Sequence, residues 1–204
     1  MKIERINSYE DNRFKKIVLL QHGAFIINDE YKCSFEIINE FEAVVEYDKE
    51  ISNLDEIIEE FRYYAPQIST FKTNDGLLIK SFPKCDLIKI ELKDIQPTQF
   101  YISNHKIEAI SSFIRNPEDI IIQVGIYNNK YISLDGHTRL FYAISKGFSY
   151  VYGCKVELEN HMIPFIDECK KRNVYTPYDI KMIDKSEYEE KWIKFCKNIL
   201  NSAK

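Results

Sequence analysis

The segment Asp135-Gly136-His137-Thr138-Arg139 follows an apolar run and precedes a helical pattern, and its residue types could do chemistry. The first backbone N–H groups of a helix have no acceptor within the helix and carry partial positive charge, so they attract anions. Gly136 lets an anion approach the backbone, Thr138 adds a hydroxyl, and Arg139 adds a fork of N–H donors that matches phosphate oxygens. The spacing therefore predicts a phosphate-binding turn.

Two residues of this turn have further chemical roles open to them. His137 can donate to a phosphate, or transfer a proton near neutral pH. Asp135 can cap the helix, hold a metal ion or act as a base. A plainer interpretation also stands, because Asp-Gly before a helix is a common turn and cap, and it leaves His137 and Arg139 as surface residues.

The elements that must position the turn follow from local patterns. Alternating and β-branched runs predict strands over 87–92, 120–127, 130–134 and 150–157. Apolar residues at helical spacing predict helices from Ser103 to Asn116, from Thr138 to Lys146, near 164–172, and from a capping box at Ser186 and Glu189. Such a mixture is typical of an α+β fold.

The first 85 residues are predicted to form a β-rich segment with one helix. Strands are expected over 14–20, 24–28, 32–39 and 41–47, and a capping box at 52–55 opens a helix that stops before Pro66. Asn74-Asp75-Gly76 is typical of a hairpin turn. Residues 1–85 carry 16 acidic and 11 basic residues, whereas the remainder carries 16 and 17. We therefore expect two domains, 1–85 and 86–204.

Composition excludes several classes of function. The formal net charge is −4 and only 6 of the 28 basic residues are Arg, which disfavours a nucleic-acid binder. No apolar run approaches the ~20 residues that a membrane span needs. The first ten residues lack an apolar signal core, so no export is expected. The five cysteines are spread widely, which indicates reduced thiols in a cytoplasmic protein and not a zinc site.

Residues 86–157 resemble the ParB/sulfiredoxin superfamily in the order of their motifs. The resemblance rests on the strand through Leu92, the Pro97-Thr98-Gln99 segment, the following helix, the hairpin over 121–134, and a Gly-x-x-Arg turn into a helix that ends at Gly147. It implies a mixed sheet with helices for 86–204, and it leaves residues 1–85 outside any family.

Within that superfamily the turn is most similar to that of the free-serine kinases, which reads Asp-Gly-His-His-Arg. The chain differs from it only at Thr138. Sulfiredoxins carry a nucleophilic Cys where this chain has His137, and chromosome-partitioning ParB proteins carry Glu-Arg-Arg there. The resemblance thus implies nucleotide chemistry and disfavours both sulfiredoxin chemistry and partition-site binding.

The resemblance also implies roles for individual residues. Gly136, His137, Thr138 and Arg139 would hold the phosphates of ATP, ADP or another nucleotide, and Asp135 would lie near the transferred group and bind Mg²⁺. Asp135 and His137 would be catalytic.

The base that accepts the substrate proton is a separate question. The kinases supply a Glu from the segment before the first helix, but residues 97–106 contain no carboxylate. His105 is the candidate base in its place, although a solvent-facing helix histidine is the alternative. Glu91 and Asp94 are further candidates, or simply exposed charges.

The predicted function is therefore nucleotide binding, with phosphoryl transfer to a small hydroxyl compound or nucleotide hydrolysis as the reaction. Phosphoryl transfer depends mainly on positioning and charge neutralisation, which this turn can supply. One alternative is a ParB-like protein associated with DNA, as a binding module or a nuclease. Another is a relative that keeps the fold and has no catalytic activity.

Overall fold

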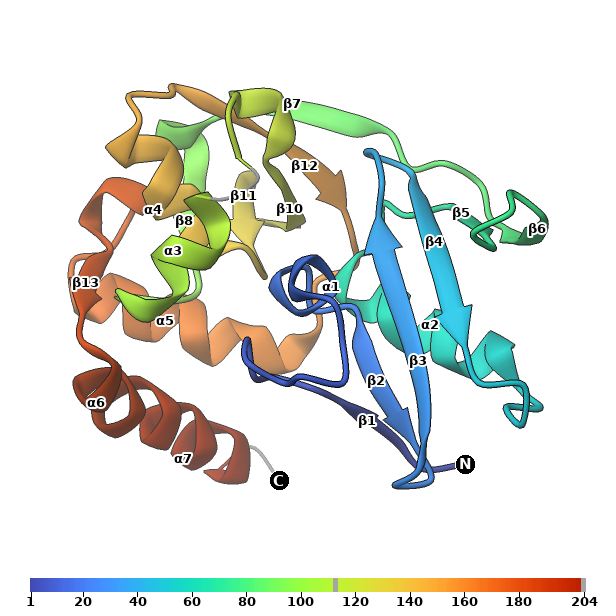
Figure 1. The fold of residues 1–204 in the computed structure, drawn as a ribbon. Helices are drawn as coiled ribbons and strands as arrows, with labels where there is room; N and C mark the ends of the chain where they lie inside the picture. The colour runs from blue at the N-terminus through green and yellow to red at the C-terminus, as the bar shows by residue number, and fades with distance from the viewer. Residues whose placement is uncertain (112–113, 203–204) are drawn as a thin grey trace. The chain divides into compact units, whose positions relative to one another are not determined.

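The computed structural model describes residues 1–111 and 114–202, and the chain divides into two compact units, Met1–Cys85 and Asp86–Lys204. Both units combine strands with helices, so the protein has the α+β class that the sequence predicts (Figure 1). None of the described helices has the length and apolar character that a membrane crossing requires.

The unit Met1–Cys85 is built on one sheet with the strand order β1-β2-β3-β4-β5-β6. Its strands are β1 (Ile3–Arg5), β2 (Ala24–Ile27), β3 (Tyr31–Ile37), β4 (Glu42–Tyr47), β5 (Thr70–Lys72) and β6 (Leu78–Ser81). The β4–β5 pair is parallel and the other neighbours are antiparallel. The parallel pair is possible because a helix makes the crossover between its two strands.

That crossover helix, α2 (Leu54–Tyr64), packs Ile57, Ile58 and Phe61 into the core of the unit, against residues of the sheet. Phe61 of α2 stacks on Phe35 of β3 with ring centroids 4.4 Å apart, and both side chains are fully buried. The helix ends before Pro66, as predicted. The expected capping box is not formed, because the N-cap residue is Asn53 and its side chain donates to the carboxylate of Glu56.

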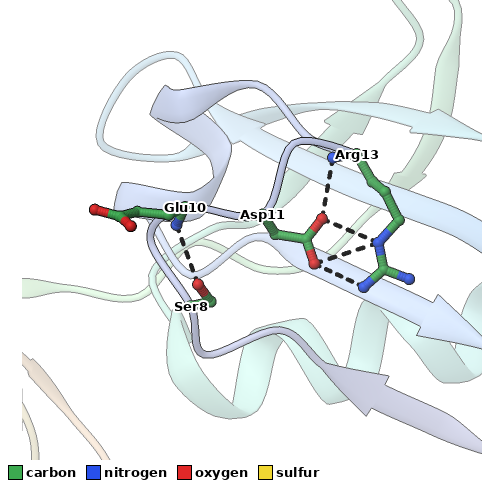
Figure 2. Close-up of polar contacts among 4 residues, drawn as sticks. All are labelled: Ser8, Glu10, Asp11 and Arg13. Carbon is green, nitrogen blue, oxygen red and sulfur yellow. Dashed lines mark hydrogen bonds and ion pairs between the residues drawn. The ribbon is translucent and has the colours of Figure 1, made fainter.

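The predicted strand over 14–20 is wrong, since Lys16–Leu20 forms the helix α1. The Asp11 carboxylate accepts from the backbone N–H and the guanidinium of Arg13, as Figure 2 shows, and this turn folds the chain back just before the helix. These hydrogen bonds lower the pKa of Asp11 to about 2. The apolar residues Val18 and Leu19, which suggested a strand, are buried against Ala24 instead.

The unit Asp86–Lys204 contains a mixed five-stranded sheet with the order β7-β12-β10-β11-β8 and a parallel two-stranded sheet, β9 and β13. The strands are β7 (Leu87–Glu91), β8 (Ile95–Pro97), β9 (Tyr101–Ser103), β10 (Ile121–Tyr127), β11 (Lys130–Ser133), β12 (Tyr150–Lys155) and β13 (Lys181–Ile183). The hairpin between β10 and β11 turns at Asn128 and Asn129, both with positive φ, which confirms that prediction.

The helices of this unit are α3 (His105–Ser111), α4 (His137–Ser145), α5 (Ile163–Lys171), α6 (Lys185–Tyr188) and α7 (Lys194–Ser202). A π-helical segment, Glu189–Ile193, joins α6 to α7, and short 3-10 helices cover Leu92–Asp94, Pro117–Asp119, Asn160–Met162 and Pro177–Asp179. Helices α3 and α4 pack together and share a core with the larger sheet. Helices α5 and α7 share a second core with β9, in which Trp192 contacts Phe100.

Two predicted helix starts are wrong. Ser103 was expected to open a helix but ends strand β9, because its main chain pairs with Ile183 of β13, a neighbour that lies 80 residues later in the sequence. Ser186 was expected to cap the last helix, whereas the cap is Asp184, whose carboxylate accepts from the backbone N–H of Glu187 at 2.8 Å. The carboxylate is the stronger acceptor of the two side chains.

Candidate functional site

The Asp135–Arg139 turn joins β11 to α4, where the first helical residue is His137. Gly136 is the N-cap residue and has φ +88°, a conformation that residues with a side chain rarely adopt. A Cβ at this position would lie 2.5 Å from Cγ2 of Ile122, so packing requires glycine as well. The intrahelical bonding begins with the N–H of Leu140 donating to the carbonyl of Gly136 at 2.9 Å. The backbone N–H groups before Leu140 are those that a helix leaves without intrahelical acceptors.

The guanidinium of Arg139 is held across this turn. Its Nη2 donates to Oδ2 of Asp135 at 2.8 Å, and its Nη1 donates to the main-chain carbonyl of Ile121 on β10. The Arg139 side chain is 24% exposed, while that of Asp135 is 59% exposed. The guanidinium is therefore fixed at the helix start, and it does not extend into bulk solvent.

His137 is buried, and its Nε2 lies among polar partners. The backbone N–H of Thr98 donates to Nε2 at 3.1 Å, and the Ser133 hydroxyl lies 3.1 Å from the same atom. The Thr98 hydroxyl donates to the carbonyl of Ser133 at 2.8 Å. Since Nε2 accepts from a backbone N–H, the ring proton belongs on Nδ1. His137 thus ties the segment after β8 to the start of α4.

Burial lowers the pKa of His137 to about 4, and the nearby positive charge of Arg139 acts in the same direction. The imidazole is therefore neutral at pH 7. Proton transfer through Nε2 would require this atom to leave the Thr98 N–H and the Ser133 hydroxyl. In the described geometry Nε2 of His137 holds the backbone of Thr98 and lies against the Ser133 hydroxyl.

Of the other predicted site residues, Thr138 lies in the turn, and His105, Glu91 and Asp94 lie outside it. Thr138 is half-buried in the first turn of α4. His105 is exposed at the start of α3 and lines a cavity that no residue of the turn lines. Glu91 and Asp94 are both exposed. The helices that begin at His105 and His137 do pack against one another.

The sequence interpretation missed three buried polar residues near the turn. Thr98 and Ser133 hold His137, and Gln96 donates from Nε2 to the carbonyls of Pro97 and Val174 at 3.0 and 2.9 Å. Through Gln96 the strand β8 is tied to the chain that follows α5. The sequence did contain a signal for them, namely polar residues in or next to apolar strands. Such residues are buried only where their polar groups have hydrogen-bond partners.

The turn offers one carboxylate, that of Asp135, as a protein ligand for the Mg²⁺ of a magnesium–nucleotide complex. Mg²⁺ is commonly bound by one or two carboxylates together with substrate phosphates and water. Asp135 supplies one carboxylate, of which Oδ2 is shared with Arg139. Among the described residues no group of three or more His, Cys, Asp or Glu side chains could form a metal site by itself. A metal ion here would therefore depend on the phosphates for most of its ligands.

No family model matches the chain, and no curated protein matches it. Among solved structures, the chain is similar to the crystal structure of protein Atu1540 from Agrobacterium tumefaciens, with a TM-score of 0.35 and 16% identity. The match covers 48% of this chain and 62% of that protein.

Proposed function

We propose that the unit Asp86–Lys204 binds a nucleotide through its phosphates at the start of α4. The observation that carries this proposal is the position of Arg139, whose guanidinium is held at the start of α4, where the first backbone N–H groups lack intrahelical acceptors. Fixed donors at a helix N-terminus bind phosphate without reorganising, which favours affinity. The motif resemblance to the ParB/sulfiredoxin superfamily, and to its free-serine kinase branch, agrees with this proposal.

In this proposal the residues of the turn have three different roles. The backbone of Gly136, His137 and Thr138, the Thr138 hydroxyl and the Arg139 guanidinium would hold the phosphates of ATP or ADP. Asp135 would hold Mg²⁺, which neutralises phosphate charge when bound. His137 would fix the segment through Thr98 so that the phosphates meet preformed donors.

The proposed reaction is phosphoryl transfer to a small hydroxyl compound, or nucleotide hydrolysis. A base would take the proton from the hydroxyl or water, whose oxygen then attacks the terminal phosphorus as the remaining nucleotide leaves. His105 is the exposed histidine of α3 and remains the proposed base. Asp135 is the carboxylate nearest to the proposed phosphate position in the sequence.

Calorimetric titration of the full chain with ATP and ADP, with and without Mg²⁺, tests the proposal. Arg139→Ala removes the guanidinium, whose N–H groups not engaged by Asp135 and Ile121 would donate to the phosphate. It should weaken nucleotide binding by at least tenfold, since a hydrogen bond to a charged group is worth ~1.5–3 kcal/mol. Arg115→Ala removes an exposed arginine that is not part of the Asp135–Arg139 turn and is the matched control. Unchanged affinity in Arg139→Ala, with a folded protein, would contradict the proposal.

A second measurement separates the proposal from the DNA-associated alternative. Binding of duplex DNA, measured by gel shift at two salt concentrations, should be weak. A tight and strongly salt-dependent DNA affinity would favour the alternative, because phosphate-backbone contacts release counterions. If no nucleotide raises the melting temperature, the chain is a relative without nucleotide chemistry.

A further inference from the structure

The connection between β8 and β9 links the Asp135–Arg139 turn to the C-terminal helices of the same unit. It consists of Thr98, Gln99 and Phe100 and has no regular secondary structure. The N–H of Thr98 donates to Nε2 of His137 in the turn. The side chains of Gln99 and Phe100 contact the C-terminal helices instead. Three successive residues thus join the proposed phosphate site to the second core of the unit.

Tyr188, the last residue of α6, holds this connection through a hydrogen bond. Tyr188 is 6% exposed, and Nε2 of Gln99, a residue 89 positions earlier in the chain, donates to its hydroxyl at 3.1 Å. The same Nε2 donates to the carbonyl of Tyr101, so the amide is fixed. The ammonium of Lys106 on α3 lies 5.1 Å from the centroid of the Tyr188 ring, a distance typical of a cation–π contact. Tyr188 therefore contacts both the connection and α3.

Trp192 holds the next residue of the connection through ring packing. Phe100 is 3% exposed, and its ring centroid lies 5.0 Å from that of Trp192 in an edge-on arrangement. Trp192 belongs to the π-helical segment Glu189–Ile193, which begins directly after Tyr188. π-helical turns are rare and occur frequently at functional sites. The C-terminal helices thus fix two successive residues of the connection, one by a hydrogen bond and one by an aromatic contact.

The fixed positions of Gln99 and Phe100 restrict Thr98, because successive residues share a rigid peptide plane. Thr98 is 3% exposed, and its hydroxyl donates to the carbonyl of Ser133 at 2.8 Å. The donor–acceptor distance of a good hydrogen bond varies by only about 0.5 Å. A displacement of Gln99 would therefore be transmitted to the hydrogen bond between the Thr98 N–H and His137.

We infer that Tyr188 is a positioning residue of the proposed nucleotide site. It acts through Gln99 and Thr98 on the imidazole of His137, in the first turn of α4. The inference rests on the proposed nucleotide binding and assigns the C-terminal helices a part in it. A purely structural Tyr188 would contribute to stability, but its loss would change neither the Thr98–His137 hydrogen bond nor nucleotide affinity.

NMR of the isotope-labelled full chain at pH 7, without nucleotide, tests the effect of Tyr188 on the hydrogen bond. Tyr188→Phe removes the hydroxyl and keeps the ring in the core. We expect the Thr98 amide and the imidazole nitrogens of His137 to change chemical shift. The Thr98 amide should also exchange with solvent about threefold faster, since its hydrogen bond is weakened. Tyr150→Phe removes a tyrosine hydroxyl that donates to Glu118, and as the matched control it should leave both sets of resonances unchanged.

Calorimetric titration of the same variants with Mg²⁺-ATP tests the effect on the site. Tyr188→Phe should bind about three- to tenfold more weakly than the wild type, the range expected when one neutral hydrogen bond is lost. Tyr150→Phe should bind as the wild type does. Gln99→Leu removes the other partner of the contact. The double variant of Tyr188→Phe and Gln99→Leu should bind no more weakly than Gln99→Leu alone, because both changes break the same hydrogen bond.

Three results would overturn the inference. The first is that the Thr98 and His137 resonances are unchanged in Tyr188→Phe. The second is unchanged nucleotide affinity in that variant, and the third is a double variant whose loss is the sum of the two single losses. A wild-type chain that binds no nucleotide contradicts the proposed function, and with it this role of Tyr188. The spectra of the free protein distinguish that failure, because they show separately whether the Tyr188 contact reaches His137.

Discussion

The chain contains the pair Asp-Gly at two turns, one in each unit, and the two glycines have nearly the same φ. Gly76 has φ +86° and Gly136 has φ +88°. Their surroundings differ completely, because a Cβ at Gly76 would meet no atom within 4 Å, whereas a Cβ at Gly136 would collide with Ile122. The same local signal therefore marks an open hairpin in one unit and an enclosed helix start in the other.

The aspartates differ in the same way. Asp75 accepts from the hydroxyl of Thr73, within its own hairpin. Asp135 accepts from Arg139, and that guanidinium also reaches the carbonyl of Ile121 on a neighbouring strand. An Asp-Gly pair therefore specifies a turn, and the residues packed around the turn decide whether it is open or enclosed.

The largest expected contrast is between Gly136→Ala and Gly76→Ala. Gly136→Ala should lower the free energy of unfolding by about 3 kcal/mol, since a left-handed alanine and a steric overlap both cost energy. Gly76→Ala has only the backbone cost, about 1 kcal/mol. Urea unfolding followed by circular dichroism measures both. Fluorescence of Trp192, the single Trp of the chain, reports on the second unit. Equal losses would show that packing at Ile122 relaxes around the added methyl group.

A second test uses His137, the buried histidine next to Gly136. The hairpin turn at Gly76 has no corresponding histidine. The folded pKa of His137 is about 4, below the 6.5 of a free histidine. Between these values the unfolded chain binds the proton first, so stability should fall as the pH drops from 6.5 to 4, by up to about 3 kcal/mol. Above pH 6.5 His137 should not contribute to the pH dependence of the free energy of unfolding. Urea unfolding monitored at Trp192 across this range measures the effect.

His137→Gln is the control for the pH dependence. Its side-chain oxygen can accept from the Thr98 N–H, and it does not titrate. The variant should show a flatter profile between pH 6.5 and 4 than the wild type. Identical slopes in both proteins would mean that the pKa of His137 is the same in the folded and the unfolded chain.

The smallest expected difference is between the two aspartates. Asp135→Asn removes a partly exposed ion pair with Arg139 and should cost about 0.5 kcal/mol, less at high salt. Asp75→Asn keeps an oxygen acceptor for Thr73 and should leave the unfolding midpoint unchanged. Denaturation at low and high salt measures both. A cost for Asp135→Asn that does not depend on salt would indicate that it acts through hydrogen bonding and not through charge.

Much of the second unit could be predicted from short-range patterns. The strands β7, β10, β11 and β12 and the helix α4 lie within a residue or two of their expected bounds. The helix at 16–20 could not be predicted this way, because Val18 and Leu19 suit a buried strand or helix equally well. Strand β9 could not be predicted either, since its pairing partner β13 is remote in sequence.

The candidate site divides along the same line. The turn itself was visible in the residue types at 135–139. The burial of His137 and its partners Thr98 and Ser133 was not, because the Thr98 contact joins residues 39 apart in the chain. A histidine next to a glycine turn can be exposed or buried, and the local sequence does not decide between the two. For His137 the segment after β8 decides it, because Thr98 covers Nε2.

The amino-acid sequence alone determined where the backbone must turn, since the left-handed conformations at Gly136, Asn128 and Asn129 depend on atoms within one or two residues. Only the tertiary structure decided which turns are enclosed and which side chains of other segments contact them. The reason is that burial and hydrogen bonding depend on segments brought together by folding, as when β10 supplies Ile121 and Ile122 to the turn of Arg139.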